Sequence, residues 1–308
     1  PNLILSVSNY VDNALVSSYD YVHDALGQSI RRNDDRFTYD SRRQLTSSLQ
    51  TLQTLQTPQT LQTLQTFSYD RIGNFTETVD LNGTNVWTAN ALNQYASVGG
   101  TAFSYTPDGG LSSDGRFDYT FDSGNRLTSV STGGVTLATF AYDALSRRVR
   151  KTTPEATHLY FYDGWNLVLE RIERADGTVD EVEYFWGKDL SGTFGTAGGV
   201  GGLLYLRENG MEYAPLYDAN GNVMQYVDRI GAVVASYVYD AFGRTLAATG
   251  PLADRFRFRF STKYHDPETG LVYYGYRFYA PAHARWLTPD PLEEQGGLNL
   301  YAFCANNP

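Results

Sequence analysis

Cysteine and histidine are scarce in this sequence of 308 residues. Its one cysteine, Cys304, excludes an internal disulfide framework. The four histidines, His23, His158, His265 and His283, lack His-Glu-x-x-His spacing, and no Cys-x-x-Cys pair exists, so no metal site is predicted. A phosphate-binding loop and a Gly-x-Ser-x-Gly nucleophile elbow are missing too, and we expect no cofactor.

Long apolar runs and helical patterns are also missing. The apolar stretches Val200–Leu206 and Ile230–Ala235 are short and interrupted by glycine, so no membrane-spanning segment is predicted. No long stretch places apolar residues at helical spacing, which predicts few and short helices. The chain starts at Pro1 without a methionine or the basic segment of a signal peptide, so we expect it to be a piece of a longer protein.

Positive charge is in deficit. The formal net charge of −10 argues against nucleic acid as a partner of the whole surface, because such a partner requires a basic face. Short basic clusters do occur, the longest of them at Arg147–Lys151. We expect this cluster to be the solvated end of a strand rather than a binding patch.

The chain is rich in tyrosine, and the dipeptide Tyr-Asp returns inside one short phrase. Each copy has an apolar residue before it and turn-forming residues after it. The copies are Tyr39-Asp40, Tyr69-Asp70, Tyr142-Asp143, Tyr162-Asp163, Tyr217-Asp218 and Tyr239-Asp240. Several copies follow one another after about 20 residues, a step that is typical of repeat architectures.

Each phrase predicts one β-hairpin. Residues before the Asp alternate between apolar and polar, the pattern of a half-buried strand. The Asp carboxylate can accept hydrogen bonds from backbone N–H groups two residues on, and the Gly or Asn that follows tolerates the positive φ of a tight turn. The fold class is therefore all-β, with hairpin beside hairpin in a twisted antiparallel sheet. We expect the tyrosines to stack on neighbouring strands on one face and to be structural; the alternative is an ordinary β-sandwich with coincidental Tyr-Asp pairs.

One segment departs from this pattern. Residues 49–66 repeat Leu-Gln-Thr, with Pro58 once in place of Leu. A period of three fits neither helix nor strand, and proline blocks a central strand position. We interpret this segment as a surface loop insertion, with a short coil of β-helix-like turns as the alternative.

The C-terminal part has the most specific sequence. It runs Tyr-His-Asp-Pro-Glu-Thr-Gly-Leu-Val-Tyr-Tyr-Gly-Tyr-Arg-Phe-Tyr-Ala-Pro over residues 264–281, then Arg-Trp-Leu-Thr-Pro-Asp-Pro over 285–291 and Gly-Gly-Leu-Asn-Leu-Tyr-Ala-Phe over 296–303. This closely resembles the Rhs repeat-associated core of the Rhs/YD-repeat family. That family includes bacterial polymorphic toxins, the shell subunits of insecticidal Tc toxins, and teneurins. The Tyr-Asp units upstream resemble the repeats of the same family.

The resemblance implies a β-ribbon that spirals into a shell around a C-terminal toxin or effector. It divides the chain into a YD-repeat region at 1–215 and the last repeats with the core at 216–308. The partners it implies are the protein's own effector as cargo and a secretion or delivery machinery, in a secreted or cell-surface setting. An exposed adhesin-like module that binds glycans or proteins is the alternative function.

The resemblance also implies an aspartyl autoprotease at the end of the core. Asp290 matches the first Asp of its pattern, and the partner carboxylate lies in a motif beyond residue 308. Because this chemistry requires two carboxyl groups that share a proton, we expect the present chain to be no enzyme by itself. Relatives often have Arg where this chain has Pro289, and Gly where it has Ala284. The alternative for Asp290 is a turn residue in a rigid Pro-Asp-Pro segment.

Overall fold

The computed structural model describes residues 3–53 and 60–308. Nearly all of its secondary structure is strand, and within each sheet every strand pairs antiparallel with its neighbours in the sequence. The predicted all-β fold class is therefore confirmed. Helical structure in the described part is limited to three short 3-10 turns, η1 (Phe260–Thr262), η2 (Glu293–Gly296) and η3 (Cys304–Asn306). None of the described helices is long and apolar enough to cross a membrane.

Two large sheets form one ribbon. The first sheet has ten strands: β1 (Ser6–Val11), β2 (Ala14–His23), β3 (Ser29–Arg32), β4 (Asp35–Tyr39), β5 (Leu45–Gln53), β6 (Thr60–Tyr69), β7 (Phe75–Asp80), β8 (Gly83–Ala89), β9 (Tyr95–Val98) and β10 (Thr101–Ala102). The second has fourteen: β11 (Ser104–Tyr105), β12 (Leu111–Ser113), β13 (Asp118–Phe121), β14 (Leu127–Thr132), β15 (Val135–Tyr142), β16 (Arg148–Thr152), β17 (Ala156–Asp163), β18 (Asn166–Arg174), β19 (Val179–Trp186), β20 (Leu203–Glu208), β21 (Met211–Tyr217), β22 (Val223–Asp228), β23 (Val233–Tyr239) and β24 (Thr245–Thr249). The ladder is interrupted once, at Phe103, so the single continuous sheet that the repeats predicted is divided in two.

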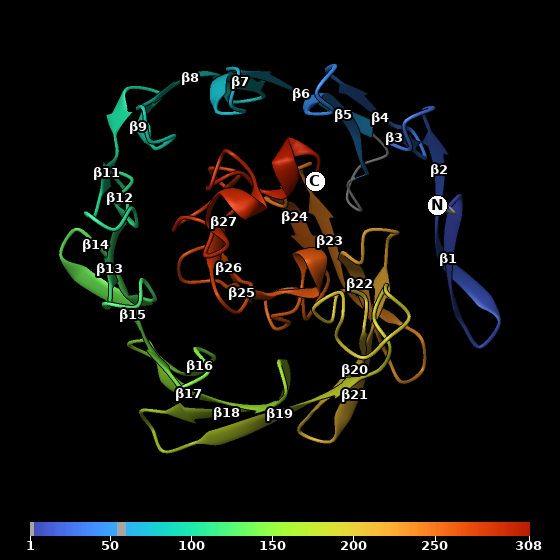
Figure 1. The fold of residues 1–308 in the computed structure, drawn as a ribbon. Coiled ribbons are helices and arrows are strands. Elements are labelled where there is room, and N and C mark those ends of the chain that lie inside the picture. Colours follow the sequence, from blue (N-terminus) through green and yellow to red (C-terminus); the bar gives the residue numbers. More distant parts are fainter. Residues whose placement is uncertain (1–2, 54–59) are drawn as a thin grey trace.

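The ribbon curls into a ring that overlaps itself. Figure 1 shows β1 and β2 on the outside of β21–β23, while the chain ends inside the ring. Strand order follows sequence order within each sheet, because most connections are short turns that join adjacent antiparallel strands, and the longer loop at 187–202 also joins adjacent strands, β19 and β20. The described residues do not form the ordinary β-sandwich that was the alternative to a repeat ribbon.

Residues 250–308, here called the core segment, fill the ring. They hold a third sheet of four short strands, β25 (Tyr264–Asp266), β26 (Leu271–Tyr273), β27 (Phe278–Ala280) and β28 (Arg285–Trp286). Inward side chains of the ribbon, such as Val130 and Tyr226, share one buried cluster with Phe256, Tyr279 and Leu287 of the core segment. The core segment thus supplies the second layer that the inner face of the ribbon needs.

The Leu-Gln-Thr tract is not a loop over most of its described length, which corrects the expectation from the sequence. Residues 45–53 and 60–69 are the two arms of a long hairpin, with Leu49 opposite Leu64 and Gln50 opposite Thr63. Pro58 lies outside the described residues. The tract forms strands because an antiparallel hairpin pairs its own backbone N–H and C=O groups. In addition, the inner face of the hairpin meets polar groups rather than an apolar core. Gln50 is buried, while Leu64 is exposed.

The division at residue 215 stays a prediction. β21 runs through this position, so the backbone itself shows no break there.

Candidate functional site

The repeat unit is organised by an aspartate at the start of each turn, as Asp143 illustrates. Its Oδ1 accepts hydrogen bonds from the backbone N–H groups of Leu145 and Arg147, both at 2.9 Å, and its Oδ2 accepts one from Arg147 Nε at 2.8 Å. Burial opposes ionisation, but the hydrogen bonds from Arg147 and Leu145 outweigh it and lower the pKa of Asp143. The carboxylate therefore holds the turn closed in its ionised form.

The same pair of backbone hydrogen bonds recurs along the ribbon. Residues that accept from the N–H groups two and four positions on are Asp24, Asp40, Asp70, Asn90, Asp122, Asp218, Asp228 and Asp240. Four of these have no tyrosine directly in front: Asp122, which ends the variant phrase Tyr119-Thr120-Phe121-Asp122, and Asp24, Asn90 and Asp228, which were missed. The signal that finds them is Asp or Asn followed three residues later by Gly or Asn.

Asp163 differs from the other members of the predicted set. Its strand continues to Asp163, which pairs with Asn166 across a hairpin of two residues, Gly164 and Trp165. Gly164 has a φ of 56°, as tight hairpin loops of this length require.

The tyrosines act as hydrogen-bond staples between successive hairpins. Each hydroxyl donates to a backbone carbonyl at the start of an earlier strand of the ribbon, at 2.6–2.9 Å. The pairs are Tyr39 with Ser29, Tyr69 with Leu45, Tyr142 with Leu127, Tyr162 with Arg148, Tyr217 with Leu203, and Tyr239 with Val223. Their rings lie on one side of the ribbon, partly or fully buried. The expectation of ring stacking alone overlooked this hydrogen bond.

The overlapping ends of the ribbon meet at a polar seam. Asp218 of the β21–β22 turn forms an ion pair with Arg32 of β3 at 3.1 Å, and the hydroxyl of Tyr21 accepts a hydrogen bond from Ala219 N at 2.9 Å. Further along, Gln50 Nε2 donates to Tyr239 O at 3.0 Å. The ends of β21 and β23 and the turn after β21, which belong to the second circuit of the ribbon, thus contact β2, β3 and β5 of the first circuit.

The core segment is tied to the ribbon by buried charge. Asp266 accepts from Arg148 at 2.5 Å and from Lys151 at 3.0 Å, and Lys151 also contacts Glu268 at 3.0 Å. Burial by itself would raise the pKa of Asp266, but the attraction of the two cations and their hydrogen bonds outweigh it and lower this pKa to about 2. The sequence predicted that this basic cluster is the solvated end of a strand. For Arg148 and Lys151 the prediction is wrong, because both side chains are buried in ion pairs.

A second buried carboxylate, Glu170, joins the same two layers. It accepts hydrogen bonds from Tyr184 at 2.9 Å and from Tyr264 of the core segment at 2.6 Å, and it contacts His158 Nδ1 at 2.7 Å. Burial opposes ionisation, but the contacts with His158 and Tyr264 lower the pKa of Glu170 to about 2. Both carboxylates thus join the layers in their ionised form.

The last residues form a strap, residues 299–306, that contacts turns of the first circuit. Asn299 Nδ2 donates to Asn74 at 3.0 Å, the Tyr301 hydroxyl donates to Gly109 O at 2.8 Å, and Asn306 Nδ2 donates to Gly73 O at 2.8 Å. The apolar residues Leu298, Leu300, Tyr301 and Phe303 predict an interior position for this part of the chain. Tyr301 is buried.

Phe303 of the strap is buried as well. Leu298, which directly precedes the strap, is 70% exposed and contradicts the expectation of an interior position.

Asp290 lies on the loop that precedes the strap. Its Oδ2 forms an ion pair with Arg277 at 2.7 Å, and its Oδ1 accepts from Leu292 N at 2.9 Å. Arg277, from another part of the core segment, thus places a cation beside Asp290, although Pro289 stands where relatives have Arg. The described residues contain no cluster of three His, Cys, Asp or Glu side chains suited to a metal ion.

Comparisons with known proteins agree with this architecture. The family model of the teneurin YD-shell matches residues 194–308. The tRNA nuclease WapA of Bacillus subtilis (strain 168) is 34% identical over 254 residues, which are 79% of this chain and 10% of the relative. The double-stranded DNA deaminase toxin A of Burkholderia cenocepacia (strain H111) is 26% identical over 93% of this chain and 21% of the relative. The chain thus spans about a tenth to a fifth of the length of these relatives.

Among solved structures, TcdB2-TccC3 without its hypervariable C-terminal region superposes with a TM-score of 0.76. It is 21% identical, over 96% of this chain and 17% of that one. At this level of identity the likeness concerns the fold.

Proposed function

Because this chain belongs to the Rhs/YD-repeat family, we propose that it is a section of a toxin shell that encloses a C-terminal effector. The observation that carries the proposal is the seam. A ribbon whose second circuit is bonded to its first through Asp218 and Asp240 forms a closed wall rather than an open sheet. Relatives of this chain are named as a tRNA nuclease and a double-stranded DNA deaminase toxin, and these are activities that a shell would keep from acting on its producer.

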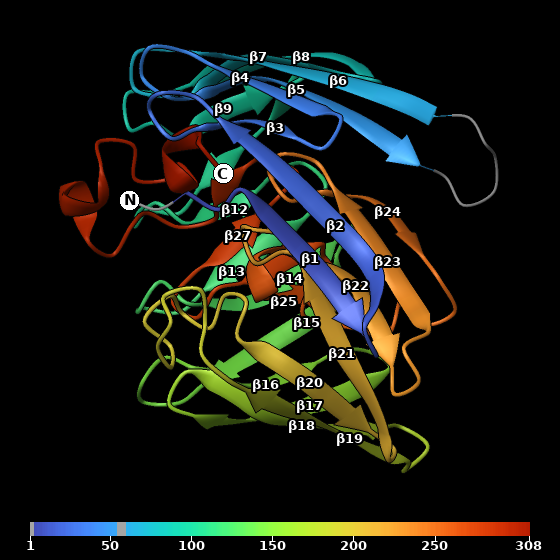
Figure 2. The same ribbon diagram turned by 90° about the vertical axis from the view of Figure 1, so that its right-hand side faces the viewer.

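The direction of the spiral indicates where the effector would lie. We call the edge of the ribbon that carries the Tyr-Asp turns the YD rim; it lies on the left in Figure 2. The YD rim of the second circuit contacts the opposite edge of the first, since Arg244 beside Asp240 pairs with Asp80 at 2.9 Å. Circuits that precede this one in a longer spiral would therefore stack on its YD rim. The segment with η2 projects from the YD rim, toward the interior that these earlier circuits would enclose (Figure 2). The effector would lie in that interior.

Delivery follows from the same proposal. A shell that holds a toxin needs a machinery that exports or injects it, so we place the parent protein among secreted or cell-surface proteins. An adhesin-like role gains no support from the tyrosines, because their hydroxyl groups are used for hydrogen bonds inside the ribbon.

Enclosure is tested by protease protection in the complete protein that contains this chain. We expect trypsin to leave the effector region intact while the shell is native and to degrade it once the shell is unfolded in urea. The same effector expressed alone is the control and should be degraded at once. Degradation at equal rates in the native protein and alone would overturn the proposal, and glycan binding in that case would favour the adhesin.

We further propose that Asp290 acts with a carboxylate beyond residue 308 in self-cleavage of the complete protein. Its ion pair with Arg277 holds the carboxyl group in place beside a cation, and a carboxylate is the kind of group that can serve as the base of such a pair. Asp290→Asn in the complete protein should abolish cleavage, whereas the control Asp163→Asn, on an exposed hairpin, should leave it unchanged. Cleavage of Asp290→Asn at the original rate would make Asp290 a turn residue only.

A further inference from the structure

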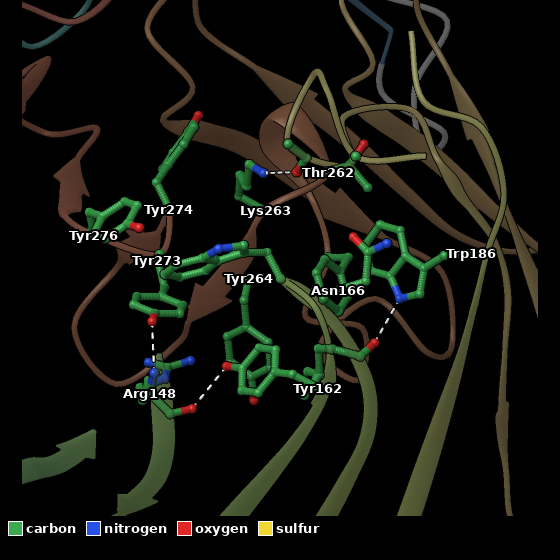
Figure 3. A pocket seen from close by; sticks show the side chains of 16 residues that line it. Arg148, Tyr162, Asn166, Trp186, Thr262, Lys263, Tyr264, Tyr273, Tyr274 and Tyr276 are labelled. Atoms are coloured by element: carbon green, nitrogen blue, oxygen red, sulfur yellow. Dashed lines mark hydrogen bonds between the residues drawn. The ribbon is translucent and has the colours of Figure 1, made fainter. Parts of the chain in front are cut away.

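We propose that a pocket between the ribbon and the core segment binds one aromatic side chain of the enclosed effector. This inference rests on the proposed function for the identity of the occupant, but the pocket is a feature of this chain alone. Its walls come from the ribbon, from the glycine-rich loop at 187–202 and from the core segment (Figure 3).

The walls present ring faces. Tyr162 and Trp186 line the pocket from the ribbon, and Tyr264, Tyr274 and Tyr276 line it from the core segment. Such faces receive another ring in an edge-to-face or offset arrangement, which contributes about 0.5–1.5 kcal/mol per pair beyond area burial.

Trp186 and Tyr162 use their polar atoms in hydrogen bonds within the protein. Trp186 Nε1 donates to Leu167 O at 2.7 Å, and the Tyr162 hydroxyl donates to Arg148 O at 2.9 Å. These hydrogen bonds turn the donors into the wall and leave the rings toward the cavity, as Figure 3 shows for Trp186 and Tyr162. The rings of Trp186 and Tyr162 therefore favour a planar group.

The size of the pocket fits a single ring. Its volume is about 240 Å³. A cavity of about 150 Å³ in another protein is sufficient for benzene, and pockets for drug-sized ligands start at about 300 Å³. A phenol or indole side chain lies between these limits.

Glycine residues make room for this arrangement. Gly199 has a φ of 80°, and a Cβ atom there would lie 3.2 Å from the Trp186 ring. A Cβ on Gly275, whose φ is 97°, would lie 3.2 Å from Trp165. The run Gly198–Gly202 is part of the loop that closes one wall.

The mouth of the pocket is aromatic and exposed. Trp165 is 45% exposed and Tyr276 is 63% exposed, with ring centroids 4.7 Å apart. Both stand in turns next to the YD rim, on the side where the proposed interior lies. Large exposed apolar groups that gather at one place mark contact sites for a partner.

A cation at the pocket adds a preference for a hydroxylated ring. Lys263 lines the cavity and donates one of its three N–H groups to Gly198 O. A tyrosine that enters would bring its oxygen within reach of the same ammonium group. Among aromatic side chains we therefore expect tyrosine to bind best.

The pocket itself is tested with this chain and small probes. We expect 4-methylphenol, the side chain of tyrosine, to shift the indole N–H signals of Trp165 and Trp186 in NMR spectra, with millimolar affinity. Cyclohexanol should bind at least fivefold more weakly, because it has no ring face. Tyr276→Ala should weaken the binding of 4-methylphenol at least fivefold.

The control variant is Phe161→Ala, which removes an aromatic ring that is 47% exposed on the outer face of β17. It should leave the affinity for 4-methylphenol unchanged. Equal binding of the two probes, or equal binding by Tyr276→Ala and Phe161→Ala, would overturn the inference.

The occupant is tested in the complete protein with the photo-crosslinker p-benzoylphenylalanine, placed once at Tyr276 and once at Phe161. We expect light to join the effector region to position 276 and not to position 161. A protected effector without a crosslink from position 276 would overturn this inference and leave the shell proposal standing. An effector that is not protected from trypsin would overturn both.

Discussion

Replacement of Asp266 by Asn should strongly destabilise the union of ribbon and core segment. Asp266 is fully buried and faces two buried cations, Arg148 at 2.5 Å and Lys151 at 3.0 Å. In Asp266→Asn the carboxylate charge disappears while the side-chain volume stays the same. Arg148 then has no carboxylate partner, and Lys151 keeps only Glu268.

Two arguments give the magnitude. Removal of one partner from a buried ion pair costs about 3–5 kcal/mol in other proteins. Independently, the pKa of Asp266 lies at about 2 instead of 3.8, and this displacement corresponds to about 2 kcal/mol. We therefore expect Asp266→Asn to lower the free energy of unfolding by about 2–5 kcal/mol.

The same shift fixes the sign of the pH dependence. The pKa of Asp266 is lower in the folded state than in the unfolded state, so its contribution to stability is complete above about pH 4. It is lost as the pH falls from about 4 to about 2. The variant lacks the titrating group, so the difference between variant and parent should shrink over this interval.

The assay is unfolding in urea, followed by tryptophan fluorescence at pH 7 and at lower pH. Asp163→Asn is the matched control, because Asp163 is exposed on its hairpin. A loss below about 1 kcal/mol for Asp266→Asn, or an equal loss in both variants, would refute the role of the buried ion pairs.

Two further substitutions test the repeat unit in the same urea assay. Tyr142→Phe removes the 2.6 Å hydrogen bond to Leu127 O and should cost about 1–2 kcal/mol, and a cost near zero would show that the staple is not stabilising. Gly243→Ala brings a Cβ to 2.5 Å from the buried ring of Phe260 at a φ of 84°, whereas Gly134→Ala has a φ of 79° and open space around it. Gly243→Ala should therefore be the more costly of the two by about 1–3 kcal/mol, and equal costs would contradict the packing argument.

The strands and their order could be predicted from the sequence because the information is local. Alternation of apolar and polar residues sets the strand, and Asp with a following Gly or Asn sets the turn. Antiparallel pairing of neighbours then follows without long-range information. Asp24, Asn90 and Asp228 have the same turn signal but lack the tyrosine that marks the predicted phrase.

Features that depend on distant residues could not be predicted. Arg148 and Lys151 lie in a basic cluster that has the composition of a solvated strand end. Their partner Asp266 follows more than a hundred residues later, separated from Arg148 by 118 positions. Nothing in the local sequence indicates that the core segment returns to this strand.

The strands of the Leu-Gln-Thr tract could not be predicted from the local sequence either. A period of three contradicts the alternation expected for a strand over an apolar core. The inner face of this hairpin instead meets the second circuit of the ribbon, where Gln50 reaches Tyr239 O and Gln65 reaches Asp240. A polar seam accepts polar residues, so the tract pairs as strands despite its pattern.

The most direct test of the shell proposal is an electron cryomicroscopy map of the complete protein. We predict a closed wall in which earlier circuits of the ribbon stack on the YD rim of residues 3–308, with additional density for the effector inside. A map with an open ribbon, or with a closed shell whose effector lies outside the wall, would contradict the account.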